Sequence, residues 1–197
     1  MSPKLFALQE REELRVKMLD AGFELIKRHG MTHASVEKIT AAVGLGKSTF
    51  YNFFQSKELF VYEIIQYQRD VAKQDFMNLL ADREKMTAAE GRTFLKKIIF
   101  SPNSIYQYLT VEDQAKLRAS LPPEYGLNPD ADRVVMSGLF AHIEGIRSDL
   151  DYHLVANLIK TMAIALFHRD SLYQDALRRT LEALYALVFS FVFEEGA

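Results

Sequence analysis

The sequence predicts an all-α protein, with a small group of three helices at the N-terminal end and a larger helical bundle after it. Apolar side chains recur at helical spacing through most of the 197 residues, and no stretch alternates over strand length without also fitting a helix. Nearly half of the residues are apolar (49%), which is enough to build a substantial core. Four of the five prolines lie between residues 102 and 129, where they separate short helices.

Charge and composition narrow the class of protein. Residues 1–57 carry nine Lys/Arg against six Asp/Glu, a net charge of +3, whereas residues 58–197 carry fifteen against twenty, a net charge of −5. This asymmetry favours an anionic partner for the N-terminal part. The absence of cysteine excludes disulfides, thiolate metal ligands and cysteine nucleophiles.

The sequence also indicates a cytoplasmic protein with no membrane partner. The first fifteen residues contain no apolar segment of signal-peptide length. The most apolar run, residues 183–193, is shorter than the roughly 20 residues that span a bilayer.

The first predicted helix runs from about Leu8 to His29, and Gly30 follows it as a C-cap. Its apolar residues form one stripe between positions 14 and 26. Gly22 lies within this stripe, although glycine inside a helix is less favourable than alanine by about 1 kcal/mol. We therefore expect another helix to cross closely at Gly22.

Two short helices joined by a tight turn are predicted next. Ser35 is a good N-cap for a helix that ends near Val43, and Gly44 permits the turn. The third helix runs from about Lys47 to Phe54. Five apolar residues should pack between the two helices and fix their crossing, namely Ile39, Val43, Leu45, Phe50 and Phe53.

The remaining chain is predicted to be helical in seven further segments. These lie near residues 56–82, 87–100, 103–109, 111–120, 130–146, 151–168 and 173–194.

The outward face of the third helix is rich in hydrogen-bonding side chains and carries one charge. Its members are Lys47, Ser48, Thr49, Tyr51 and Asn52. Such a face suits the major groove of DNA, where a lysine reaches a phosphate or a guanine edge and an asparagine reads adenine. Ser35 and Lys57 begin the flanking helices, where backbone N–H groups favour a phosphate.

Residues 18–31 and 35–59 resemble the tetracycline-repressor (TetR) family of transcriptional regulators. The stretch GKSTFYNFFQSKE, residues 46–58, is the most specific part of the resemblance. The resemblance implies that the outward residues of the third helix bind DNA, with Lys57 holding the DNA backbone. Four residues depart from those usual in the family, namely Thr40, Val43, Gly46 and Ser48. The glycine at 46 removes a side-chain cap from the third helix.

The resemblance also implies a helix-turn-helix DNA-binding domain over residues 1–56 and an effector-binding and dimerisation domain over residues 57–197. In the family, the last two helices pair with their copies in a second subunit. Here the last helix is apolar on most sides, which would leave a large exposed patch without a partner. We expect a homodimer whose interface includes Leu158, Met162, Leu181, Leu184, Val188 and Phe191.

Bulky side chains in the larger domain have two interpretations, a packed core or the wall of a cavity for a small hydrophobic effector. The second interpretation comes from the resemblance, and periodicity does not separate the two. The residues concerned are Phe94, Phe100, Tyr106, Met136, Phe140, His142, Met162 and Phe167. Tyr106 and His142 would supply polar anchors for such a ligand.

The function predicted is that of a transcriptional regulator, a repressor in preference to an activator. It would bind a palindromic double-stranded DNA operator as a homodimer, under the control of a small-molecule effector, with no cofactor, no metal and no enzymatic activity. One alternative is a helical ligand-binding protein that does not read DNA. Another is a small helical enzyme, although no catalytic constellation is evident.

A nucleotide hydrolase is a further alternative, suggested by residues 44–49, GLGKST. A phosphate-binding loop needs glycine where Ala41 stands, and a buried strand before it where a helix is predicted. His142 and Glu144 are similar to part of a zinc deaminase motif, but the motif's cysteines are missing. The five histidines, at positions 29, 33, 142, 153 and 168, show no metal-ligand spacing.

Overall fold

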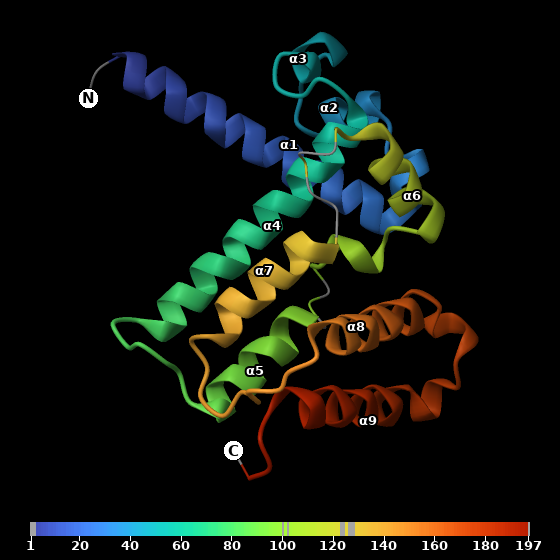
Figure 1. Cartoon of the computed structure of the whole chain (residues 1–197). Helices are drawn as coiled ribbons and strands as arrows, with labels where there is room; N and C mark the ends of the chain where they lie inside the picture. Colours follow the sequence, from blue (N-terminus) through green and yellow to red (C-terminus); the bar gives the residue numbers. More distant parts are fainter. Residues whose placement is uncertain (1–2, 100, 102, 123–124, 126–128, 197) are drawn as a thin grey trace. The chain divides into compact units, whose positions relative to one another are not determined.

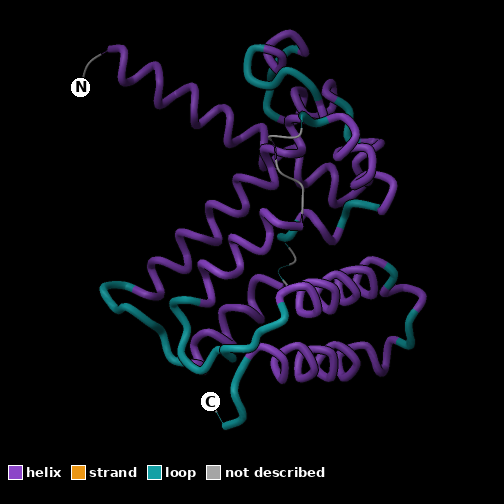
Figure 2. The backbone as a smooth tube through the Cα atoms, viewed as in Figure 1, coloured by secondary structure: helices purple, strands orange, loops and turns teal. Residues whose placement is uncertain are grey.

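The computed structural model describes residues 3–99, 101, 103–122, 125 and 129–196, with the side chains of 3–7 and 129–132 left aside (Figure 1). Over these residues the chain consists of α-helices and short 3-10 turns, and the only β pairing is two isolated bridges (Figure 2). The predicted all-α fold is confirmed. None of the described helices is both long and apolar enough to cross a membrane.

The chain divides by its internal packing into two compact units. Unit 1 comprises Met1–Asp70 and Tyr108–Pro122, and unit 2 comprises Val71–Gln107 and Pro123–Ala197. One boundary therefore falls inside a continuous helix, α4 (Lys57–Leu80). The predicted boundary between a DNA-binding domain (residues 1–56) and an effector-binding and dimerisation domain (residues 57–197) is a functional one, and it stays a prediction.

Unit 1 contains the N-terminal helices and one helix from the middle of the chain. They are α1 (Pro3–His33), α2 (Val36–Ala42), α3 (Lys47–Tyr51), the first part of α4, and α6 (Val111–Ser120). Helix α1 is longer than predicted at both ends. Its backbone leaves the helical conformation at Gly30, which has φ 76° and ψ 162°, and a helical turn then resumes as far as His33. Helix α3 is shorter than predicted, ending at Tyr51.

An aromatic cluster forms the centre of unit 1. The rings of Phe50, Phe54 and Phe60 are almost fully buried, and their centroids lie 4.8–5.2 Å apart. Gly22 of α1 lies against Phe60, so closely that a Cβ atom there would come 2.3 Å from Cζ of the ring. The close helix crossing predicted at Gly22 is therefore confirmed.

Unit 2 is built from the end of α4 and four further helices, α5 (Ala88–Ile99), α7 (Pro129–Phe140), α8 (Tyr152–Phe167) and α9 (Gln174–Val192). The 3-10 turns η1 (Ile105–Gln107) and η3 (Arg169–Ser171) also belong to its described part. Within the predicted 103–109 segment, only η1 is helical. Helices α8 and α9 pack side by side (Figure 1).

The predicted helix over 130–146 ends six residues early, because the chain makes other hydrogen bonds there. The backbone N–H of Met86 donates to the carbonyl of His142 (2.9 Å), and the N–H of Glu144 donates to the carbonyl of Met86 (3.0 Å). Gly145 then takes a positive φ of 68°. The N–H groups of His142 and Ile143 still donate to the carbonyls of Leu139 and Phe140, and from Glu144 on the chain bonds to the distant segment instead.

We predict that Gly22→Ala destabilises the protein despite the better helix propensity of alanine. Overpacking against the buried Phe60 ring should cost about 1–3 kcal/mol, which outweighs a propensity gain of about 1 kcal/mol. Urea unfolding followed by circular dichroism measures the difference. Gly138→Ala in α7 is the matched control, since no described atom lies within 4 Å of its Cβ position, and it should be neutral or stabilising. Equal behaviour of the two variants would contradict the crossing at Gly22.

Candidate nucleic-acid interface

The turn between α2 and α3 has the geometry predicted from the sequence. Gly44 takes a φ of 72°, a conformation that side chains resist, and the N–H of Leu45 donates to the carbonyl of Thr40 (2.8 Å). Ile39 and Phe50 are fully buried. Val43, Leu45 and Phe53 are half-buried. These contacts fix the direction in which α3 is presented.

The departures from the family's usual residues are accommodated locally. Thr40 is buried, and its hydroxyl donates to the carbonyl of Val36 (3.0 Å), so no polar group is left without a partner there. Gly46 is the N-cap of α3 and makes no side-chain cap bond.

Four of the five predicted α3 contact residues are exposed. Lys47, Ser48, Tyr51 and Asn52 face solvent, and Thr49 is half-buried. Tyr51 is a large aromatic side chain that remains 51% exposed. An exposed aromatic hydroxyl beside an amide and an ammonium group forms a surface rich in hydrogen-bond donors.

The two predicted flanking residues are partly engaged inside unit 1. Ser35 caps α2, its hydroxyl accepting from the N–H of Lys38 (3.3 Å). The Lys57 ammonium group donates to the carbonyl of Thr32 (3.3 Å). Partial burial, with Lys116 nearby, lowers the pKa of Lys57.

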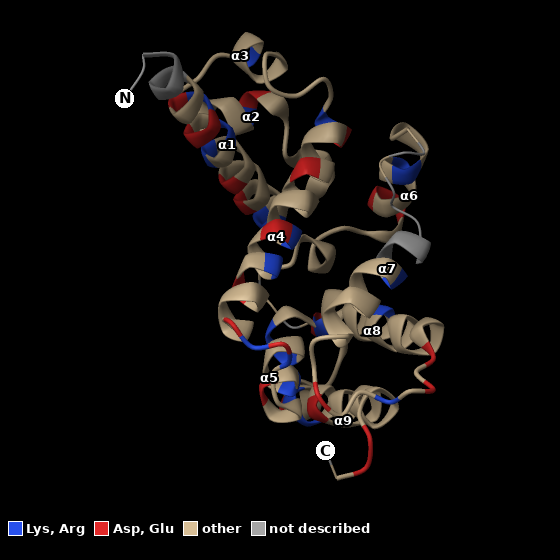
Figure 3. Cartoon of the chain, turned by 60° about the vertical axis from the view of Figure 1, so that its left-hand side comes forward, with Lys and Arg blue, Asp and Glu red and all other residues tan. Residues whose placement is uncertain are grey.

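Helix α2 supplies a carboxylate to the start of α3. The Lys47 ammonium nitrogen lies 2.5 Å from Oε1 of Glu37, and both side chains are more than half exposed. The hydrogen bond from Lys47, with further ones from the backbone N–H of Glu37 and the Ser35 hydroxyl, lowers the pKa of Glu37 to about 2. The same pair raises the pKa of Lys47. Figure 3 shows the acidic and basic positions along α2 and α3.

Arg11 of α1 reaches the other end of α3. Its guanidinium donates to the carbonyl of Asn52 (2.7 Å) and lies 4.3 Å from the centroid of the Phe53 ring. Sequence reasoning missed this residue. The two contacting positions are 41 residues apart, and nothing in the local pattern distinguishes Arg11 from other solvent-facing basic residues.

The residues predicted to line an effector cavity are spread over unit 2. Phe94, Phe140 and Met162 belong to its core, and Met136 packs against that core. His142, Tyr106 and Phe167 are exposed, and Phe100 lies outside the described residues. The ring nitrogen Nδ1 of His142 lies 2.9 Å from the carbonyl of Glu84, so this histidine holds a loop. The structure does not gather the predicted set around one space.

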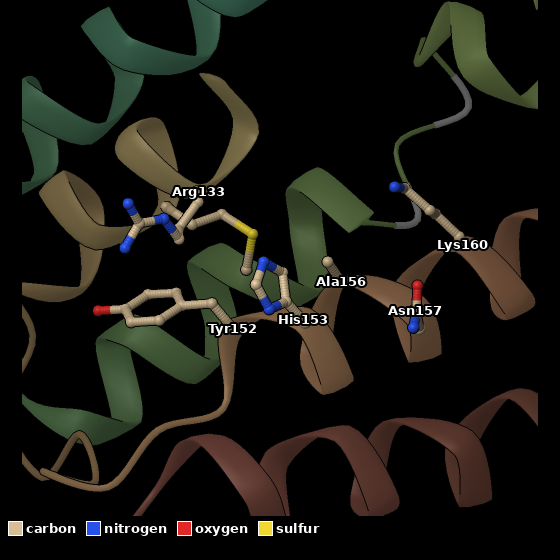
Figure 4. Close-up of a pocket in the computed structure, with 7 residues that line it drawn as sticks. Arg133, Tyr152, His153, Ala156, Asn157 and Lys160 are labelled. Atoms are coloured by element: carbon tan, nitrogen blue, oxygen red, sulfur yellow. The ribbon is translucent and has the colours of Figure 1, made fainter. Parts of the chain in front are cut away.

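A cavity of about 290 Å³ lies between α7 and α8 of unit 2 (Figure 4). Its lining is Arg133, Met136, Tyr152, His153, Ala156, Asn157 and Lys160. Only Met136 belongs to the predicted effector set. The polar ends of Arg133 and Tyr152 lie toward one side, and Lys160 lies at the other end. The lining therefore combines two cations with other polar side chains and a few apolar groups.

The residues predicted for the dimer interface differ in exposure. Met162 and Val188 are 1% exposed and belong to the core of unit 2. Leu158, Leu181 and Leu184 are half-buried, and Phe191 is 40% exposed. Met162 and Val188 are therefore occupied by contacts within the chain itself.

We predict that the Glu37 carboxyl titrates well below its ordinary value of 4.5, with a midpoint of about 2. The signal to follow is the side-chain carboxyl carbon in NMR. Because the folded-state pKa is lowered, the stability contributed by the pair is complete above pH 4.5 and is lost as the pH falls toward 2. Lys47→Met should return the midpoint toward 4.5. A wild-type midpoint near 4.5 would show that the pair does not form in solution.

Comparison with known proteins supports the interpretation of α2 and α3. Residues 18–64 match the family model of the bacterial regulatory proteins of the tetR family. A sequence search of curated proteins finds no match.

Solved structures share the fold of the chain at low identity. The fatty acid degradation regulator FadR from Bacillus halodurans has a TM-score of 0.58 at 18% identity, covering 89% of this chain and 94% of that one. FadR from Bacillus subtilis in complex with stearoyl-CoA has a TM-score of 0.56 at 20% identity, covering 88% and 96%. A TetR family regulator from Marinobacter aquaeolei VT8 has a TM-score of 0.54 at 17% identity, covering 95% and 99%. The segment that contains α2, α3 and the turn between them, residues 18–64, is thus similar to the tetR family of bacterial regulatory proteins.

Proposed function

We propose that the chain is a transcriptional repressor that binds a palindromic DNA operator as a homodimer and is released or retained by a small-molecule effector. The observation that carries the proposal is the exposed face of α3, presented beside a turn whose direction is fixed by buried contacts. A surface that is rigid in its backbone and rich in donors is what base reading in a major groove requires.

The contacts divide into base readers and phosphate binders. Asn52 and Lys47 have the side chains that pair with adenine and guanine edges, and the Tyr51 hydroxyl suits a phosphate oxygen. Ser48 and Thr49 offer hydroxyls on the same helix. Ser35 and Lys57 lie at the starts of α2 and α4, where they would meet the DNA backbone. On this proposal residues 1–56 form the DNA-binding domain and residues 57–197 the effector-binding and dimerisation domain.

The surface of unit 2 supports a homodimer through α8 and α9. Helix α9 exposes Ala183, Leu187 and Phe191 at four-residue spacing, which places them along one face. Leu187 is 43% exposed, and Ile164 of α8 is 55% exposed. Apolar side chains in such rows mark a surface that a partner covers. Two copies of α3 would then read two half-sites about one helical turn apart, which compensates for the shortness of each helix.

Unit 2 is also the proposed site of the effector. FadR from Bacillus subtilis is described in complex with stearoyl-CoA, and its fold resembles that of this chain. The cavity between α7 and α8 is close in size to the smallest ligand sites of proteins. Its cations, Arg133 and Lys160, favour a small ligand with an anionic group. The effector changes operator affinity only by its different affinity for the two states of the protein.

We predict that a random duplex library yields a palindromic motif when selected with the purified protein. Asn52→Ala should cost about 1–3 kcal/mol and relax specificity at one position of each half-site. Lys47→Ala, which removes a side chain that pairs with a guanine edge, should weaken binding of the operator more than binding of unrelated duplexes. Binding isotherms at several salt concentrations measure both effects.

Lys97→Ala is the matched control for Lys47→Ala. Lys97 is also exposed and also paired, its ammonium lying 3.0 Å from Asp75, but it belongs to α5 of unit 2. It should leave DNA affinity nearly unchanged. Equal effects of the two lysine variants, or unchanged affinity in Asn52→Ala and Tyr51→Ala, would reject α3 as the reading helix. The alternative of a helical ligand-binding protein that does not read DNA would then gain support.

We predict that Leu187→Glu converts the dimer to a monomer, because it places a charge on the apolar face of α9. Sedimentation velocity measures the mass, and operator affinity should fall with it. Val134→Glu in α7 is the control, since Val134 is apolar and 65% exposed but lies on another helix. A dimer that persists in Leu187→Glu would place the interface elsewhere.

A further inference from the structure

The one basic residue of α3 is not free in the isolated protein. Lys47 opens the helix, whose remaining residues through Tyr51 carry no charge. Its ammonium group lies 2.5 Å from the Glu37 carboxylate of α2. Glu37 therefore occupies the ammonium group that DNA would use.

The pair is exposed enough to exchange partners. The side chains of Lys47 and Glu37 are 55% and 58% exposed, so water and other anions reach both. An exposed ion pair contributes little free energy, and a DNA phosphate or guanine edge is an alternative partner for the same ammonium group. Once Lys47 moves to DNA, the Glu37 carboxylate is left unpaired close to the phosphates and repels them.

We propose that Glu37 lowers operator affinity by holding Lys47 in the free protein. The operator then contacts the Lys47 ammonium group only by displacing the Glu37 carboxylate. This inference rests on the proposed function, in which α3 reads DNA. Glu37 itself binds no DNA; it is a residue that sets how tightly the operator is held.

The effect differs between duplexes. A DNA sequence that contacts Lys47 well displaces Glu37, and the loss of the Lys47–Glu37 ion pair then weakens the binding of that duplex. A duplex with a weaker contact leaves the pair intact, and nothing is subtracted. Removing the carboxylate should therefore raise operator affinity more than the affinity for a scrambled duplex.

Glu37→Gln tests this with the full-length protein and two duplexes, the selected operator and a scrambled version of it. Glutamine keeps the length of the side chain and removes the charge. Operator affinity should rise roughly 1.5- to 5-fold for each copy of α3 that docks, the range set by the strength of exposed ion pairs. The scrambled duplex should gain less.

Glu24→Gln is the matched control for net charge. Glu24 is 48% exposed on α1 and lies 3.7 Å from both Lys27 and Arg28, so its replacement also removes one charge and breaks exposed pairs. It should change both duplexes equally and weakly. A second control is Glu37→Gln in a Lys47→Met background, where the gain should shrink to that of Glu24→Gln.

Three results would overturn the inference while leaving DNA reading intact. The first is that Glu37→Gln weakens operator binding, which would mean that the carboxylate orients Lys47 for DNA. The second is that the gain from Glu37→Gln persists in the Lys47→Met background, which would mean a general charge effect. The third is that operator affinity does not change at all, which would mean that Lys47 stays paired with Glu37 when DNA is bound. If neither wild type nor Glu37→Gln retains any duplex from the library at low salt, the proposed function fails and the inference with it.

Discussion

The presentation of α3 depends on the packing of Phe50 against Phe54 and Phe60, and of Phe60 against the bare backbone at Gly22. A helix of five residues is too short to be stable alone in water, because nucleation costs more than so few hydrogen bonds return. Burial of the Phe50 side chain against Phe54 and Phe60 holds it instead. The absence of a side chain at Gly22 lets Phe60 approach α1, and Phe60 in turn supports Phe50. The orientation of the exposed face of α3 is thus fixed by buried residues.

The aromatic cluster does not fix the two ends of α3. Charged contacts hold these two ends. Glu37 lies against Lys47 at the start, and Arg11 donates to the carbonyl of Asn52 at the end. Positive charge at a helix C-terminus and hydrogen bonding of its last carbonyls are both favourable. The two contacts differ in consequence for DNA binding. Arg11 engages a backbone atom and leaves the Asn52 side chain free, whereas Glu37 engages the functional group of Lys47 itself. The same exposed helix is therefore supported at one end and restrained at the other.

Local sequence was sufficient to predict the turn and the close helix crossing. Gly44 permits the turn, Ser35 caps the helix before it, and Gly22 allows another helix to approach closely. The ends of several helices were not predictable, since distant segments decide them. Helix α7 stops at Phe140 because Met86 pairs with the backbone of 142–144. The Arg11 and Glu37 contacts join helices through space and leave no periodic signal. The described members of the predicted effector set are spread over unit 2 for a related reason. Periodicity reports that Phe94 and Met162 are buried, and it does not say whether they face a cavity or a packed core.

The order of the chain constrains how a ligand in unit 2 could act on unit 1. The polypeptide passes between the units three times, after Asp70, after Gln107 and after Pro122. The first passage lies within the continuous helix α4. The other two flank α6, which packs in unit 1 although its sequence neighbours on both sides belong to unit 2. The cavity is lined by α7, the next helix after α6, and by α8. A ligand there would contact α7 first, and α7 follows α6 in the chain. Substitutions within α4 and within α6 should therefore change ligand coupling by different amounts, even where they leave operator affinity in the absence of ligand unchanged.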